Sequence, residues 1–292
     1  MNREFMELFL ERTAFPQEAR TCVLSAADVL SEELDRLVAE FHKEYDCKTL
    51  DEMITPVADT SDISRFTVWM AVLILAAEKA KALYPDEQVF WDTFCDLKYK
   101  AYECKEIHGV WGNFVVFWYP IFYRGTIVKL GRLEFETVSC PQESPLTIGN
   151  VTISPGQKIY SIHIPSSGEP FTPEARLESY RRALEYFNPE NGILICQCNS
   201  WLLYPEYDKI LPSNSNIRRF AKEFALILSR ETEQFADAWR VFGREHDVNP
   251  GDLPERTSLQ RAFKQHLLIG GTVGIGSGAL IFDGERILTK QQ

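Results

Sequence analysis

The residues best suited to chemistry lie at the ends of two apolar segments. His163 stands one residue before the end of the first segment, Ile159–Ile164, which alternates like a half-buried strand. Imidazole titrates near neutral pH, so His163 can take a proton from an amine substrate. A histidine packed between a sheet and a helix is the structural alternative.

The second segment, Ile193–Cys198, is followed by Asn199, Ser200 and Trp201. The amide and the hydroxyl can bind polar groups of a ligand, and the indole can form the wall of a pocket. Alternatively, Asn199 and Ser200 make a turn and Trp201 fills a domain interface. Because open α/β sheets bind ligands outside the carboxyl ends of their strands, the two segment ends together predict one site.

A polar loop, Ser166–Pro170, leads from the first segment to a helix that begins with Thr172 as N-cap and Pro173 as first helical residue. Unpaired amides at a helix N-terminus bind phosphate, aided by the macrodipole. However, Gly168 is the only glycine of the loop, and Glu169 would repel an anion. An ordinary connection capped by Thr172 is therefore the alternative.

Two further pairs of residues have either a functional or a structural role. Arg132 and Glu134 alternate along a predicted strand, Thr126–Thr137, where they either grip a substrate or form a structural ion pair. Cys196 and Cys198 point to one side of their strand, and no Cys-x-x-Cys or histidine pair completes a metal site. We expect buried thiols here, since a catalytic Cys198 would need His163 as its base.

Other motifs are excluded by their context. The glycine cluster at 270–278 follows a helix, precedes a strand and contains no lysine, so it predicts a glycine-rich strand close to another backbone rather than a phosphate loop. Neither Gly-x-Ser-x-Gly nor His-Glu-x-x-His occurs, which disfavours a serine hydrolase or a zinc protease.

The periodicity of apolar residues changes near residue 125. Residues 1–125 show helical spacing. The aromatic density of Asn113–Tyr123 also suits a strand, but Gly112 before it and Gly125 after it favour a short buried helix. Residues 126–292 alternate strands with helices. We therefore predict an α/β (α+β) protein, with a helical N-terminal domain at 1–125 packed on a mixed sheet flanked by helices at 126–292.

The second domain is expected to contain a hairpin or an irregular strand at 147–153 and a helix from Thr172 to Phe187. After these come a helix from Ser215 that continues to Ile227, a strand at 239–242, a helix at 257–268 and a final strand around 273–282.

The composition and charge of the chain disfavour several classes of function. The 292 residues carry a formal net charge of −11, which argues against binding a nucleic-acid backbone as the main role. No signal peptide is recognised at residues 1–14, and the longest apolar run, Phe66–Ala77, is too short to span a bilayer. Seven cysteines without a secretion signal predict reduced thiols in the cytoplasm.

Four phrases of the sequence, Leu130–Glu136, Ile162–Pro165, Cys198–Leu203 and Ser215–Ile217, resemble a bacterial family of predicted acyltransferases. Its members pair a helical N-terminal domain with a GNAT-like C-terminal domain. The resemblance covers nearly the whole chain and is most specific at residues 126–225.

The resemblance implies acyl-CoA as cosubstrate. Its pyrophosphate would lie against Ser166, Ser167, Gly168 and Thr172, and its pantetheine arm would bind Asn199. Asn216, with Asn214 and Ser215, would precede the helix beside the thiol end, unless these three residues only cap that helix.

The resemblance also implies the reaction, which moves an acyl group to a small-molecule or peptide amine. A strand-end amide near Ile164 would polarise the thioester, His163 would deprotonate the amine, and Ser200 or Tyr207 would protonate the leaving thiolate. Arg132, Glu134 and Trp201 would contact the acceptor. No metal, nucleic acid or membrane partner is expected. The alternative is a GNAT-shaped ligand-binding or interaction module without catalysis.

Overall fold

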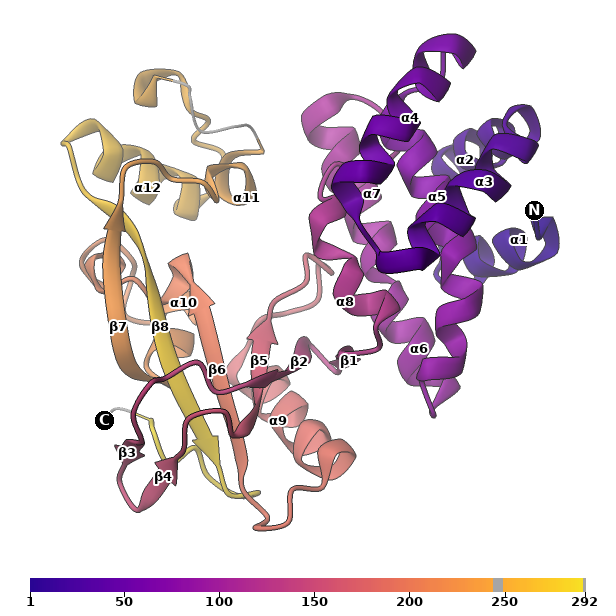
Figure 1. The fold of residues 1–292 in the computed structure, drawn as a ribbon. Coiled ribbons are helices and arrows are strands. Elements are labelled where there is room, and N and C mark those ends of the chain that lie inside the picture. Colours follow the sequence, from indigo (N-terminus) through magenta and orange to yellow (C-terminus); the bar gives the residue numbers. More distant parts are fainter. Residues whose placement is uncertain (244–248, 291–292) are drawn as a thin grey trace. The chain divides into compact units, whose positions relative to one another are not determined.

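The computed structural model (Figure 1) describes residues 1–243 and 249–290. The chain divides into two compact units, which we describe separately. One contains Met1–Leu130 together with Pro165–Gly168, and the other contains Gly131–Ile164 together with Glu169–Gln292. A domain boundary at residue 125 stays a proposal.

The first unit is built from helices, as predicted. Helix α5 (Arg65–Ala80) is buried from Thr67 to Ala77 and packs against α2, α3 and α4, because its apolar residues surround the whole helix. The short helix expected within 113–123 is present as a 3₁₀ turn and α8. The other α-helices of the unit are α1 (Arg3–Arg12), α2 (Gln17–Val29), α3 (Ser31–Glu44), α4 (Cys47–Ser61), α6 (Glu87–Phe94), α7 (Asp96–His108) and α8 (Pro120–Tyr123).

A mixed six-stranded sheet, in the order β1-β2-β5-β6-β8-β7, forms the centre of the C-terminal part (Figure 1). Only β5 and β6 run parallel among the pairs with a defined register. The predicted hairpin at 147–153 is confirmed as β3 and β4. The strands are β1 (Ile127–Leu130), β2 (Leu133–Ser139), β3 (Leu146–Ile148), β4 (Val151–Ile153), β5 (Lys158–His163), β6 (Leu194–Ser200), β7 (Ala225–Thr232) and β8 (Val273–Phe282).

The helices of the second unit are α9 (Pro173–Phe187), α10 (Asn216–Ala221), α11 (Ala238–Phe242) and α12 (Ser258–Leu268). Helix α9 packs on β2 and β6, where the ring of Phe187 lies 3.9 Å from that of Tyr160 and 6.4 Å from that of Phe135. The opposite sheet face carries a small apolar cluster that includes Ile159 and Ile195, covered by residues of β3 and β4. The sheet is therefore covered on both faces at this end.

Three predicted elements are wrong or only partly right. The strand expected from Thr126 to Thr137 is broken by a turn at Gly131, whose φ of +70° suits glycine. The strand expected at 239–242 is helix α11. An ion pair between Asp237 and Arg240, with 2.9 Å between Oδ1 and Nε, and Gly243 in the left-handed region close this single turn.

The helix expected from Ser215 to Ile227 ends at Ala221, because the following residues enter β7 and pair with β8. The predicted glycine-rich strand is confirmed as β8. A Cβ atom at Gly276 would overlap the backbone carbonyl of Leu203, so only glycine fits this approach.

Within the described part of the chain, every helix is too short or too polar to cross a membrane. All seven cysteines lie in that part, and none of them forms a disulfide.

Candidate functional site

His163 ends β5 beside two carboxylates of β2. In the antiparallel β2–β5 ladder, Glu134 stands directly opposite His163 and Glu136 opposite Ser161, so all four side chains share one sheet face. The Nε2 atom of His163 lies 2.9 Å from Oε2 of Glu136, and the two side chains are 25% and 20% exposed. Glu134 is 1% exposed. A carboxylate thus orients a partly accessible imidazole, which is the arrangement of an oriented general base.

The parallel strands β5, which His163 ends, and β6 separate toward their carboxyl ends (Figure 1). Their pairing covers only Tyr160 with Cys196 and Ser161 with Gln197. Beyond that point β6 continues to Ser200 and pairs only with β8 on its other side. The two strands are therefore paired over only part of their length.

Polar side chains continue across the sheet face that carries His163. Gln197 follows Ser161 in the β5–β6 register, and Asn199 stands opposite Ser277 of β8. Asn199 is exposed and accepts a hydrogen bond of 3.0 Å from the hydroxyl of Ser277. This polar row can hydrogen-bond an acceptor that approaches the imidazole.

The N-terminus of α9 is capped as predicted. The hydroxyl of Thr172 accepts a hydrogen bond of 3.3 Å from the amide of Ala175. The carboxylate of Glu174 accepts hydrogen bonds from its own amide and from the Thr172 hydroxyl, which lowers the pKa of Glu174. An incoming phosphate would have to displace this carboxylate, and the exposed Glu169 lies only three residues before Thr172.

Arg132 does not lie on a strand as predicted but in the turn between β1 and β2. Its amide donates a hydrogen bond of 2.8 Å to the Ser179 hydroxyl, and its Nε atom donates one of 3.0 Å to the carbonyl of Glu169. Its guanidinium carbon lies 5.3 Å from the ring centroid of Phe171. The turn thus places Arg132 beside the loop that precedes α9, whereas Glu134 lies beside His163.

The other residues implied for the cofactor occupy these positions. Ile164, directly after β5, is half-buried; Ser166 and Gly168 are exposed and Ser167 is half-buried. Asn216 is the first residue of α10 and is half-buried; the hydroxyl of Ser215, the N-cap residue, makes no capping hydrogen bond. Capping by that hydroxyl therefore does not explain this stretch.

Ser200 lies at the end of β6, where its hydroxyl accepts a hydrogen bond of 3.2 Å from the amide of Leu202. Trp201 and Tyr207 belong to a buried aromatic cluster that also contains Phe235 and Phe263, with ring centroids 4.7 to 6.3 Å apart. Burial raises the pKa of Tyr207 to about 12, so its phenol stays protonated at neutral pH. Its oxygen accepts a hydrogen bond of 3.3 Å from the amide of Gly274.

Cys196 and Cys198 are buried, as expected, on the sheet face that packs against α9. Burial raises the pKa of the Cys198 thiol to about 12 and that of Cys196 well above its ordinary value. Both are therefore protonated at neutral pH and are poor nucleophiles. Within residues 1–243 and 249–290, no three His, Cys, Asp or Glu side chains gather closely enough to hold a metal ion.

Sequence reasoning missed Glu136 as the partner of His163. The signal was present, because Glu134 and Glu136 are two residues apart and must face the same side of a strand. What the sequence did not supply was the register that sets β2 against β5.

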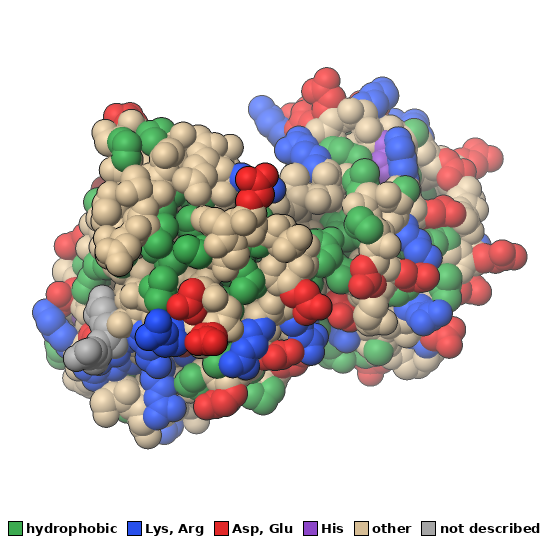
Figure 2. Space-filling model, turned by 90° about the horizontal axis from the view of Figure 1, so that it is seen from below, with side chains coloured by type: hydrophobic (Ala, Val, Ile, Leu, Met, Phe, Trp, Pro, Cys, Tyr) green, Lys and Arg blue, Asp and Glu red, His purple; other side chains and the backbone are tan. Residues whose placement is uncertain are grey.

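Acidic and basic side chains lie among one another on the protein surface. Figure 2 shows Lys and Arg side chains interspersed with Asp and Glu on the face in view, where they form no continuous basic track among the described residues. The net charge of −11 reflects an excess of acidic over basic side chains in the sequence.

Comparison with known families and structures adds independent findings. Residues 4–125 match an N-acyltransferase N-terminal domain, and residues 127–280 match a GNAT-like C-terminal domain. Comparison with curated proteins finds no match.

The fold is similar to the crystal structure of an acyltransferase in complex with decanoyl-CoA and teicoplanin, with 23% identity and a TM-score of 0.73 over 94% of this chain and 87% of that chain. It is also similar to an acyltransferase mutant in complex with octanoyl-CoA, with 23% identity and a TM-score of 0.71 over 95% of this chain and 87% of that chain.

Proposed function

This chain belongs to the N-acyltransferase family with a GNAT-like C-terminal domain, and we propose that it transfers an acyl group from acyl-CoA to an amine. The family match confirms the resemblance drawn from the sequence. The observation that carries the proposed reaction is the separation of β5 and β6 beside the His163–Glu136 pair. A gap between two parallel strands suits an extended pantetheine arm, and a base at its edge suits an attacking amine.

In the proposed mechanism, His163 takes a proton from the acceptor while the amine nitrogen attacks the thioester carbonyl. We assign this proton transfer to the imidazole of His163, which Glu136 holds through its Nε2 atom. Glu136 orients the ring and stabilises the imidazolium that forms. A backbone amide near Ile164 stabilises the oxyanion, since a preorganised donor is most effective where charge develops.

The C–S bond then breaks, and the departing thiolate takes a proton to give free CoA and the N-acylated product. We assign this proton to Ser200 rather than Tyr207. Ser200 then regains a proton from solvent, and the imidazolium of His163 releases to solvent the proton that it took from the amine. Ser200 ends β6 at the gap between the strands, whereas Tyr207 is 1% exposed within the aromatic cluster and has its pKa raised to about 12. Tyr207 remains the second candidate, because a protonated phenol holds a proton to give.

Acceptor binding is proposed on the sheet face of His163. Glu134 stands opposite the histidine, and Gln197 and Asn199 extend the polar row, which suits a small-molecule or peptide amine with hydrogen-bonding groups. Arg132 and Trp201 are weaker candidates here, because Arg132 contacts the loop before α9 and Trp201 lies in the aromatic cluster. We place the protein in the cytoplasm, in keeping with seven cysteines that form no disulfide.

One experiment separates catalysis from its alternative. Calorimetry with acetyl-CoA and decanoyl-CoA measures binding, and thiol release in the presence of a panel of primary amines measures transfer. Binding together with amine-dependent thiol release is the expected result. Binding without transfer would favour the non-catalytic module. Absence of binding at millimolar acyl-CoA would contradict the proposed acyl transfer from acyl-CoA.

The proposed pyrophosphate turn, Ser166–Gly168 with the start of α9, predicts the effect of a charge at Gly168. Replacing Gly168 with aspartate should weaken acyl-CoA binding by about 1–3 kcal/mol, through repulsion and the loss of a charge-assisted hydrogen bond. Gly168 has a φ of +74° and nothing within 4 Å of a Cβ atom, so any side chain there bears a conformational cost without a clash.

Gly168→Asn is the matched control, since asparagine resembles aspartate in shape and tolerance of positive φ but carries no charge. Calorimetry should show weaker binding for the aspartate variant than for the asparagine variant. Equal affinities for the two would place the phosphate elsewhere.

A further inference from the structure

Arg176 occupies an unfavourable place for a cation. It lies in the first turn of α9, near the positive end of the helix macrodipole, and is 0% exposed. Burying an ion costs several kcal/mol unless partners satisfy it completely. An apolar side chain would fill the same space at a lower cost in folding free energy. Stability alone therefore does not explain why an arginine is buried here.

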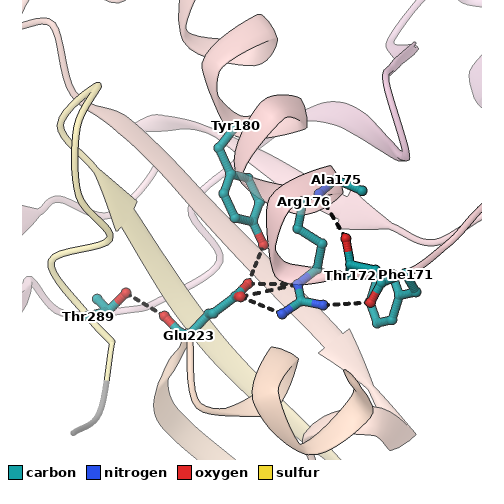
Figure 3. Close-up of polar contacts among 7 residues, drawn as sticks. All are labelled: Phe171, Thr172, Ala175, Arg176, Tyr180, Glu223 and Thr289. Carbon is teal, nitrogen blue, oxygen red and sulfur yellow. Dashed lines mark hydrogen bonds and ion pairs between the residues drawn. The ribbon is translucent and has the colours of Figure 1, made fainter. Parts of the chain in front are cut away.

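The guanidinium of Arg176 is held by two groups, the carboxylate of Glu223 and the backbone carbonyl of Phe171 (Figure 3). Its Nε atom donates to Oε2 of Glu223 over 3.0 Å, and Nη2 donates to Oε1 over 2.5 Å. Its Nη1 atom donates to the backbone carbonyl of Phe171 over 2.9 Å. Only a planar, forked cation can hold a carboxylate and a carbonyl on different edges at once.

Glu223 is held in turn by its own neighbours. It is 3% exposed, and Oε2 accepts a hydrogen bond of 2.7 Å from the hydroxyl of Tyr180, one turn further along α9. Its backbone carbonyl accepts one of 2.7 Å from the hydroxyl of Thr289 near the C-terminus. The carboxylate is thus a fixed anchor, just beyond the end of α10, for Arg176.

Arg176, held by Glu223, in turn fixes the conformation of the loop before α9. Because a trans peptide unit points its carbonyl and its amide hydrogen in opposite directions, a Phe171 carbonyl turned toward Arg176 directs the Thr172 amide away from it. The Phe171 ring also lies 4.8 Å from the guanidinium carbon and 5.1 Å from the ring of Phe220. Arg176 therefore fixes both the backbone and the side chain at residue 171.

We propose that Arg176, anchored by Glu223, is a positioning residue for acyl-CoA: it sets the conformation of residues 169–172 so that the Thr172 amide, directly before α9, faces the phosphates. Arg176 itself does not touch the cofactor. This inference rests on the proposed function, since it assigns acyl-CoA to the turn that precedes α9.

Arg176→Lys and Tyr180→Phe form a matched pair that tests the proposal. The lysine keeps the charge but loses the fork, so it cannot hold Glu223 and the Phe171 carbonyl together. The phenylalanine removes one hydrogen bond to the same carboxylate and leaves Phe171 untouched. We expect the KM and Kd for acyl-CoA to rise about tenfold in Arg176→Lys, equivalent to one charge-assisted hydrogen bond to phosphate, and to stay within about twofold in Tyr180→Phe. In neither variant should KM for the amine change.

Amide hydrogen exchange gives a readout that is independent of acyl-CoA. Exchange at residues 171, 172, 174 and 175 should accelerate in Arg176→Lys and remain near wild type in Tyr180→Phe. Equal acceleration in both variants, or equal weakening of acyl-CoA binding in both, would reduce Arg176 to a structural residue and overturn the inference. If the wild type itself fails to bind acyl-CoA, the proposed function falls first and the inference falls with it.

Discussion

Replacing His163 with glutamine is expected to lower kcat by about 10²- to 10⁴-fold, the usual contribution of a positioned general base. Glutamine keeps a donor for Glu136 and fills similar space, but it cannot take a proton from the amine. The KM for acyl-CoA should change little, because the proposed phosphate contacts lie at the start of α9. Steady-state thiol release with saturating acyl-CoA and amine measures both constants.

Two controls sharpen this test. Lys158→Gln changes an exposed residue at the other end of β5 and should leave kcat unchanged. Glu136→Gln should lower kcat less than His163→Gln does, since the imidazole remains and loses only the carboxylate that orients it. If His163→Gln retains wild-type kcat, the base is another group or water, and the His163–Glu136 pair is structural.

The sequence was informative wherever a local pattern decides local structure. Thr172 followed by Pro173 predicted the start of α9, and the structure shows the capping hydrogen bond to Ala175. The alternation around His163 predicted β5 and placed the histidine at its end. These successes share one cause: the capping group or the side-chain alternation lies within a few residues of the feature that it predicts.

The failures arise where long-range pairing overrides a local pattern. Ile227 fits the spacing of the helix from Ser215, yet pairing with β8 takes it into β7. Arg132 fits a strand alternation, yet Gly131 turns the chain beside Ser179. The contact between His163 and Glu136 depends on strand register, which neither segment specifies alone.

Replacing Glu223 with alanine is expected to destabilise the protein by about 3–5 kcal/mol, because it leaves the buried Arg176 without its counter-ion. The hydroxyl of Tyr180 loses its acceptor at the same time, which adds to the cost. Denaturant unfolding followed by tryptophan fluorescence measures the change. A loss below about 1 kcal/mol would mean that water or another acceptor replaces the carboxylate and that the pair contributes little.

The double variant Arg176→Met with Glu223→Leu separates stability from function at this site. Removing both charges together leaves no unpaired ion, and apolar side chains of similar volume often replace a buried ion pair at little cost. This variant should therefore be more stable than Glu223→Ala, although it lacks more polar contacts. It should still bind acyl-CoA more weakly than wild type, because nothing then holds the Phe171 carbonyl. A folded double variant with wild-type affinity for acyl-CoA would show that the ion pair serves neither stability nor the cofactor turn. A folded double variant with weakened affinity would explain why a buried arginine lies in the first turn of α9.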